Sequence, residues 1–227
     1  GCIAVLENEL TALSSMERDT LIASRHILGI VPKLPEQDGL ASEPGAGILG
    51  YHLPVFTGST QQSKQLDTLC DLGLPLAVDL ARTPIASLRD LIQAKPTLQV
   101  ILNHYGRPKG EPDEFETAND PWPTALQWLH EHPQTVITLS GLINPSDAGH
   151  FDDWDLPEAH FKPRLANLMA IFGEDRILFG SNWPMGLMCA SFEDTLDLMT
   201  TLIDALSPTS LAKIMGLNAA RCYGIEP

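Results

Sequence analysis

The feature that most constrains the fold is a regular alternation of short apolar runs with longer stretches of helical period. Seven runs have the length of a strand and are rich in Ile, Val and Leu. Runs that are apolar throughout are typical of strands buried on both faces, as in a parallel sheet covered by helices. The predicted strands are Cys2–Leu6, Ile27–Val31, Ile48–Leu53, Leu74–Leu80, Leu98–Asn103, Thr135–Leu139 and Arg176–Gly180.

Helical periodicity fills most of the intervals between these strands. After the last strand, Phe192, Leu196, Met199 and Ile203 recur at the spacing of one helix face. Ser207 before Pro208 is a suitable start for the final helix. The predicted helices are Glu9–Ser24, Gln61–Leu72, Ile85–Ala94, Pro123–Glu131, Phe161–Phe172, Phe192–Leu206 and Pro208–Tyr223.

Such an alternation folds either as a doubly wound sheet or as a (β/α) barrel. No Gly-x-Gly-x-x-Gly follows the first apolar run and no Walker A loop occurs, which disfavours the nucleotide-binding form of the doubly wound sheet. The 227 residues, 44% of them hydrophobic, suffice for one domain with a real core. We therefore expect a single domain over residues 1–227.

Charge and cysteine content limit the partners and the compartment. The formal net charge of −15 argues against nucleic-acid and acidic-membrane partners, which need clustered Lys and Arg. No apolar run approaches the roughly 20 residues of a membrane span, and no signal peptide opens the chain. Four scattered cysteines without a Cys-x-x-Cys pair predict reduced thiols. We expect a cytoplasmic protein with a small-molecule substrate, which could form a homo-oligomer.

Candidate functional residues follow the predicted strands, because parallel α/β folds place their chemistry where strands end and βα loops begin. His104 follows Leu98–Asn103 and could ligate a metal, act as a base or polarise a carbonyl, or serve as a hydrogen-bonded structural residue. Arg107 could bind a carboxylate bidentately or form a surface ion pair. Asn182 could donate to an oxygen or orient a water, or serve as a turn residue. Ser140 and Asp79 also stand at strand ends.

Four segments resemble the amidohydrolase-related family of metal-dependent hydrolases. They are ILNHYGRP, TLSGL, GEDRILFGSNWP and GLNAARCYGI, and they occur in this order along the chain. The resemblance extends from about Cys2 to Ile225 and is strongest to the lactonase branch, which includes sugar-lactone and pyrone-dicarboxylate lactonases. It implies a TIM-type (β/α)₈ barrel, in which water adds to a lactone carbonyl and a ring C–O bond opens.

The resemblance also implies roles for individual residues. His104 takes the position of the strand-six histidine, which polarises the carbonyl or holds a divalent metal such as zinc. Arg107 takes a position that could bind a substrate carboxylate, and Asn182 takes that of the strand-eight Asp, the general base. We further expect His52, Tyr105 and Trp183 to contact the substrate.

Three departures from the family pattern limit the inference about activity. The strand-one His-x-His is absent, because CIAVL corresponds to strand two; the chain thus shows about seven βα units and is predicted to be truncated at its N-terminus. The base position holds Asn182, and Thr138 replaces the family Lys before Leu-Ser-Gly. Two hypotheses remain: a lactonase-type hydrolase or a fragment of one, and a catalytically impaired relative that binds a small acid or acts as an assembly subunit.

Overall fold

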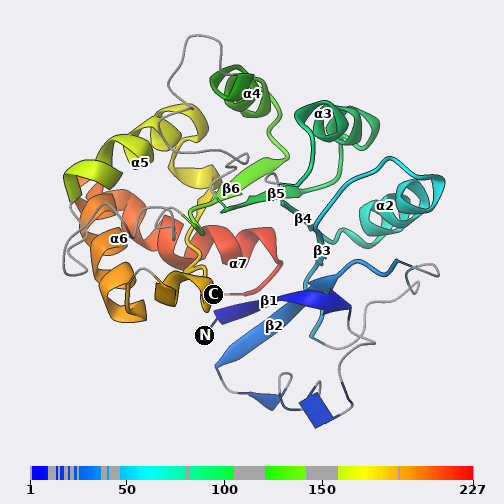
Figure 1. Cartoon of the computed structure of the whole chain (residues 1–227), viewed down its shortest axis with the longest axis horizontal. Helices are drawn as coiled ribbons and strands as arrows, with labels where there is room; N and C mark the ends of the chain where they lie inside the picture. Colours follow the sequence, from blue (N-terminus) through cyan, green and yellow to red (C-terminus); the bar gives the residue numbers. More distant parts are fainter. Residues whose placement is uncertain are drawn as a thin grey trace. The chain divides into compact units, whose positions relative to one another are not determined.

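The structure is a computed structural model that describes residues 2–9, 14, 16–17, 20, 23–24, 26–36, 40, 47–79, 82–104, 121–141, 158–188 and 190–226. Within them, seven strands form one sheet in the order β1 to β7 (Figure 1). The strands are β1 (Cys2–Glu9), β2 (Ile27–Lys33), β3 (Tyr51–Leu53), β4 (Leu76–Asp79), β5 (Val100–Asn103), β6 (Thr135–Thr138) and β7 (Ile177–Leu178). Among the described helices, none is long and apolar enough to cross a membrane.

The chain divides into two compact units, with the boundary within β5. The first comprises residues 1–101 and 221–227, and the second residues 102–220. In the first unit β1 pairs in parallel with β2, β2 with β3 and β3 with β4. In the second unit β6 pairs in parallel with β7.

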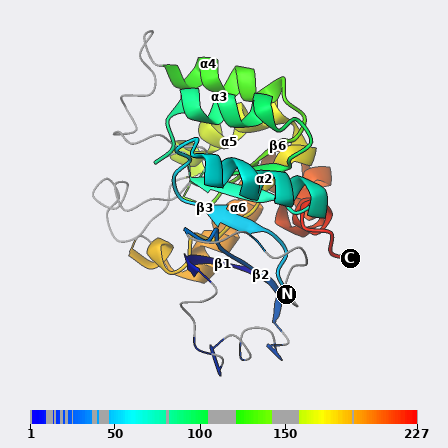
Figure 2. The ribbon, with the colours of Figure 1, turned by 90° about the vertical axis from the view of Figure 1, so that its right-hand side faces the viewer.

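The first unit covers its sheet with α2 (Thr60–Leu72) and α3 (Ile85–Ala94), which lie side by side in two views (Figures 1 and 2). Helix α2 begins where the Ser59 hydroxyl accepts a hydrogen bond from the Gln62 amide, and it ends at Gly73 in the left-handed conformation. Leu66 and Leu69 of α2 are fully buried together with Leu76 and Val78 of β4. Apolar strands and one apolar helix face thus form the core that the sequence pattern predicts.

The second unit is built from α4 (Pro121–His130), α5 (Glu158–Phe172) and α6 (Phe192–Leu206) around β6 and β7. Helix α5 packs against both α4 and α6. Ser191 caps α6, since its hydroxyl accepts a hydrogen bond from the Asp194 amide. Phe161 and Leu165 of α5 and Leu202 of α6 are fully buried.

Several predicted element boundaries were wrong, and tertiary partners explain two of them. The predicted strand Ile48–Leu53 keeps only its end, because Pro75 on the neighbouring segment has no amide hydrogen to donate. Ile48 forms an isolated bridge to Ile30 instead. The last strand shrinks to β7 because the Phe179 amide donates to the carbonyl of Ile214 rather than to another strand.

The C-terminal helix is also shorter than predicted. The range Pro208–Tyr223 divides into a 3₁₀ turn η7 (Pro208–Ser210), a π-helical turn η8 (Lys213–Leu217) and the short helix α7 (Asn218–Cys222). The Ile214 carbonyl, within the π turn, accepts the hydrogen bond from the Phe179 amide. Most of the predicted helix Glu9–Ser24 lies outside the described residues, and Glu9 itself belongs to β1.

Candidate active site

Three consecutive strands of the sheet are followed, within a few residues, by a residue with left-handed backbone. His104 directly follows β5 at φ 57°, Gly141 lies three residues beyond β6 at φ 76°, and Asn182 follows β7 at φ 56°. A positive φ is uncommon outside glycine and costs of order 1–3 kcal/mol, so it persists where the surrounding structure enforces it. The two non-glycine cases in the described residues are the two residues that the sequence placed in catalytic roles.

The His104 side chain contacts the end of β6. Its Nδ1 lies 3.2 Å from the Ser140 hydroxyl oxygen, and both residues are half-buried. The hydrogen bond fixes one ring nitrogen, which leaves Nε2 for a ligand, and the tautomer decides whether Nε2 donates or accepts a proton. Gly141 lies against the same ring, because a Cβ built on it would stand 3.7 Å from Nδ1.

Ser140 is also fixed from the other side, by the end of β7. A Cβ built on Gly180 would stand 2.9 Å from the Ser140 Cβ, closer than two such carbons approach in proteins. Glycine at position 180 is therefore what allows β6 and β7 to hold Ser140 beside His104.

Local hydrogen bonds between residues 181 and 186 hold the backbone around Asn182. The Gly186 amide donates to the Asn182 carbonyl at 2.8 Å, and the Trp183 amide donates to the Ser181 hydroxyl at 3.2 Å. Gly186 belongs to the 3₁₀ turn η6 (Met185–Met188). The backbone of Asn182 is thus used in the turn, whereas its side-chain amide remains a donor and acceptor for a ligand.

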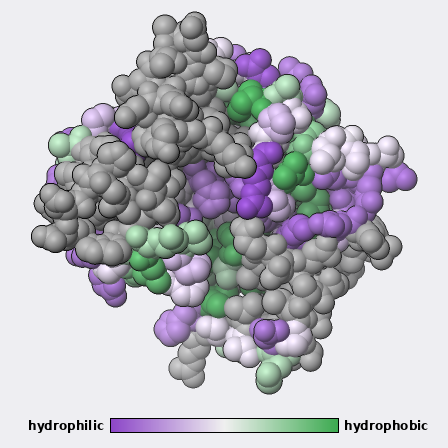
Figure 3. Space-filling model, in the orientation of Figure 1, coloured by the Kyte–Doolittle hydropathy of each residue, from purple (hydrophilic) through white to green (hydrophobic). Residues whose placement is uncertain are grey.

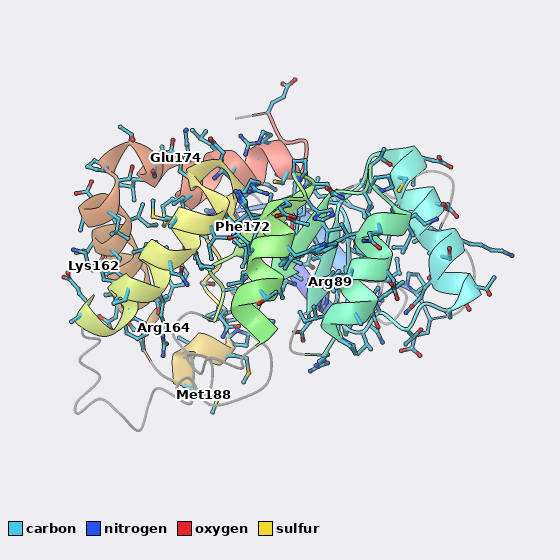
Figure 4. All side chains as sticks on the ribbon, turned by 90° about the horizontal axis from the view of Figure 1, so that it is seen from above. Arg89, Lys162, Arg164, Phe172, Glu174 and Met188 are labelled. Carbon is cyan, nitrogen blue, oxygen red and sulfur yellow. The ribbon has the colours of Figure 1, made fainter. Side chains whose placement is uncertain are left out.

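A polar cluster holds the start of β7. Buried Asn218 donates from Nδ2 to the carbonyls of Glu174 and Ile177, at 2.7 and 2.8 Å. The Glu174 carboxylate accepts hydrogen bonds from Lys213 and Ser210, which hold the pKa of Glu174 below its ordinary value of 4.5. In Figure 4 Glu174 and Met188, which flank β7 in the chain, lie at opposite edges of the second unit.

The predicted zinc ligand His104 lacks companions among the described residues. In that part of the chain no three His, Cys, Asp or Glu side chains stand close enough to hold one metal ion. A catalytic zinc ordinarily has three protein ligands. The described residues therefore do not fit such a site, and the chemistry proposed below uses side chains alone.

The remaining predicted site residues divide into three cases. Tyr105 and Arg107 lie outside the described residues, so their roles stay predictions. Trp183 follows Asn182 and is 66% exposed. His52 lies in the first unit, in the middle of β3, where it is buried and its carbonyl accepts a hydrogen bond from the Leu34 amide; substrate binding by His52 stays a prediction.

Sequence reasoning gave no role to Ser140 or to Gly180. Ser140 was noted as a strand-end residue, but its contact with His104 joins residues 36 positions apart. The alternation of strands and helices could have indicated this contact, because the residues that follow two neighbouring parallel strands lie close together. Asp79, the other strand-end residue noted, forms an ion pair with Arg82 at 3.4 Å in the first unit.

Comparison with models of known protein families identifies the family of this chain. The model of the amidohydrolase family matches residues 49–225, which include the ends of β5, β6 and β7. The chain belongs to the amidohydrolase family. The resemblance deduced from its four motifs is thereby confirmed.

Relatives within this family include two lactonases. An L-fucono-1,5-lactonase of Burkholderia multivorans is 33% identical over 138 residues, which make up 56% of this chain and 44% of that protein. An L-fucono-1,5-lactonase of Burkholderia ambifaria is 27% identical over 161 residues, 68% of this chain and 52% of that protein. The chain thus spans about half the length of the curated relatives that it matches.

Solved amidohydrolases share the fold. An amidohydrolase from Burkholderia multivorans, solved with bound zinc, superposes with a TM-score of 0.76 at 21% identity, over 99% of this chain and 83% of that one. A putative 2-pyrone-4,6-dicarboxylic acid hydrolase from Pseudomonas putida gives a TM-score of 0.67 at 19% identity, over 93% and 77% of the two chains. The predicted TIM-type (β/α) barrel architecture is confirmed, with seven strands in the part of the chain that the structure describes.

Proposed function

We propose that this amidohydrolase hydrolyses a lactone, or a related C–O bond at a carbonyl, in a small metabolite, and that His104 acts as the general base. The observation that carries the proposal is the contact of His104 Nδ1 with the Ser140 hydroxyl, 3.2 Å away, at the end of β5. An imidazole held by one nitrogen presents the other in a fixed direction, which is the arrangement of a catalytic base and its orienting group.

The residue that follows β7 bears on which side chain is the base, and therefore on the tautomer of His104 that the reaction needs. Asn182 replaces the Asp expected there, and an amide does not accept a proton from water. We therefore assign the base to Nε2 of His104, with the Nδ1 hydrogen donated to the Ser140 oxygen. Asn182 is left to donate from its amide to the carbonyl oxygen, where negative charge develops.

With these groups, every proton and bond of the hydrolysis is accounted for. The oxygen of water attacks the carbonyl carbon while one proton of that water passes to His104 Nε2. The ring C–O bond breaks as the tetrahedral intermediate collapses, and Nε2 returns the proton to the leaving alkoxide. The product is the hydroxy acid. Arg107 would bind a carboxylate of the substrate, and Trp183 would form a wall of the pocket.

Variants at His104 and Ser140 test the proposal on a panel of lactones. His104→Ala should abolish turnover, whereas His26→Ala, which removes an exposed imidazole in the first unit, should leave it unchanged. Ser140→Ala should lower kcat about tenfold, the worth of one hydrogen bond of about 1.4 kcal/mol. Turnover by the His104→Ala variant equal to that of the wild type would remove this residue from the mechanism.

Asn182 also favours a second candidate, an impaired relative that binds a small acid or serves in an assembly. Losing a base commonly costs about 10²–10⁴ in rate. If the chain is such a relative, the wild type will be inactive and Asn182→Asp will gain lactone hydrolysis. Robust wild-type activity that depends on His104 would exclude this candidate.

A further inference from the structure

The residues that follow Asn182 expose an unusual amount of apolar surface. Ten large hydrophobic side chains are exposed in the described residues, and five of them lie within Trp183–Phe192. These five, called the apolar segment below, are Trp183 (66% exposed), Met185 (53%), Leu187 (48%), Met188 (57%) and Phe192 (43%). In the orientation of Figure 1, Figure 3 shows green apolar atoms over the position of η6.

The apolar segment is structurally continuous with the candidate active site. Trp183 is the residue after Asn182, and the Gly186 amide in the middle of the segment donates to the Asn182 carbonyl at 2.8 Å. The Ala190 amide donates in turn to the Gly186 carbonyl at 3.1 Å, close to the start of α6. The segment also follows the carboxyl end of β7, the side on which (β/α) barrels bind substrates.

The size of the segment indicates what it binds. At roughly 150–250 Å² for each large side chain, the five exposed fractions leave about 500 Å² of apolar surface. A stable protein–protein interface takes about 800 Å² from each partner, so a second copy of the chain would need more than this segment. The largest apolar patch on a typical monomer covers about 300–600 Å² and is often functional, so this segment has the size of such a patch.

The side-chain types favour an apolar ligand that varies in shape. Two of the five residues are methionines, whose unbranched thioether chains adapt to irregular partners. The four residues of η6, Met185 to Met188, carry no charge. They also carry no side-chain hydrogen-bonding group of the kind that binds sugar hydroxyls.

We propose that the apolar segment binds an alkyl or aryl substituent of the substrate, so that the preferred lactone carries an apolar group rather than a set of hydroxyls. The inference rests on the proposed function for the reacting groups and extends it to the substrate class. Asn182 would donate to the carbonyl oxygen, His104 oriented by Ser140 would activate the water, and the substituent would lie on η6 with Trp183 at its border.

The test compares three lactones of one ring size: unsubstituted, alkyl-substituted and polyhydroxylated. Each methylene in contact should raise kcat/KM about fourfold, so a butyl group that contacts the segment fully should give more than a hundredfold preference over the unsubstituted ring. Leu187→Asn should reduce the ratio of the alkyl to the unsubstituted kcat/KM about tenfold. Leu217→Asn is the matched control, since Leu217 is 49% exposed but lies on η8, and it should change no ratio.

Two results would overturn the inference. One is equal or better turnover of the polyhydroxylated lactone by the wild type. The other is a Leu187→Asn variant that leaves the ratio of kcat/KM values unchanged. A change of molar mass in light scattering for the same variant would then make the segment an interface between copies.

Binding of the corresponding lactams, measured by calorimetry, separates this inference from the proposed function. Lactams resist hydrolysis but keep the ring and its substituent. If the alkyl lactam binds better than the unsubstituted one and no lactone is turned over, the apolar specificity stands and the lactonase proposal fails. If lactones are hydrolysed without alkyl preference, the lactonase proposal stands and the specificity fails. If neither binding nor turnover occurs, both fail.

Discussion

Gly180→Ala adds a single methyl group at the point where β7 passes Ser140. The added Cβ would stand 2.9 Å from the Ser140 Cβ and 3.5 Å from its Cα and amide nitrogen, so the end of β6 has to move. Overpacking of this kind costs about 1–3 kcal/mol. At roughly 2–4 °C for each kcal/mol in a chain of this size, Tm should fall by about 2–12 °C.

The same displacement should lower activity. The oxygen–nitrogen distance between Ser140 and His104 is already 3.2 Å, near the upper end for a hydrogen bond, so a shift of a few tenths of an ångström breaks it. We therefore expect the kcat of Gly180→Ala to fall about as far as that of Ser140→Ala, roughly tenfold. The measurements are thermal unfolding and initial rates with the best lactone of the panel.

Two other glycines provide matched controls for this substitution. Gly216 has no atom within 4 Å of its built Cβ and no positive φ, so Gly216→Ala should be neutral or stabilising. Gly173 has equal space but a φ of 70°, so Gly173→Ala reports the cost of backbone strain alone. Adding Ser140→Gly to Gly180→Ala removes the clash and should restore Tm without restoring activity. The packing argument is refuted if Gly180→Ala matches Gly216→Ala in both Tm and rate.

Two further predictions concern the polar cluster at the start of β7. Asn218→Ala should lower the unfolding free energy by about 1–3 kcal/mol for each carbonyl left unpaired, and Asn218→Asp, which keeps the shape but loses the donor, should be no better in urea titrations. The lowered pKa of Glu174 stabilises the fold above its ordinary value of 4.5, and this contribution is lost as pH falls through the lowered pKa. Glu174→Gln should therefore flatten the decline of stability as pH falls below 4.5. Glu226→Gln is the control, and an unchanged decline would contradict the assignment.

The alternation of strands and helices was predictable because burial imposes it on each segment separately. α3 and α6 begin and end as predicted, since each carries its own periodicity. The ends of β3 and β7 were not predictable, because they depend on tertiary partners: Pro75 beside Gly50, and Ile214 beside Phe179. No local pattern in the sequence indicates that a carbonyl in the C-terminal helix will accept a hydrogen bond from a strand.

The sequence predicted where the candidate site lies, but it did not predict which side chains contact one another there. His104 and Asn182 were found because strand ends carry chemistry in this class of fold. The pairing of His104 with Ser140 was not found, because it depends on left-handed backbone at position 104 and on the absence of a side chain at position 180. Both conditions are set by neighbouring strands.

The left-handed backbone at the ends of β5 and β7 also limits which amino acids evolution can try there. His, Asn, Asp and Gly tolerate this conformation better than other residues, whereas β-branched and bulky side chains do not. At position 182 the residues that carry an amide or a carboxylate on a short stem are therefore interchangeable without rebuilding the loop. A change between Asn and Asp requires a single step, so a lineage of such chains could gain or lose a carboxylate base repeatedly while its fold remains the same.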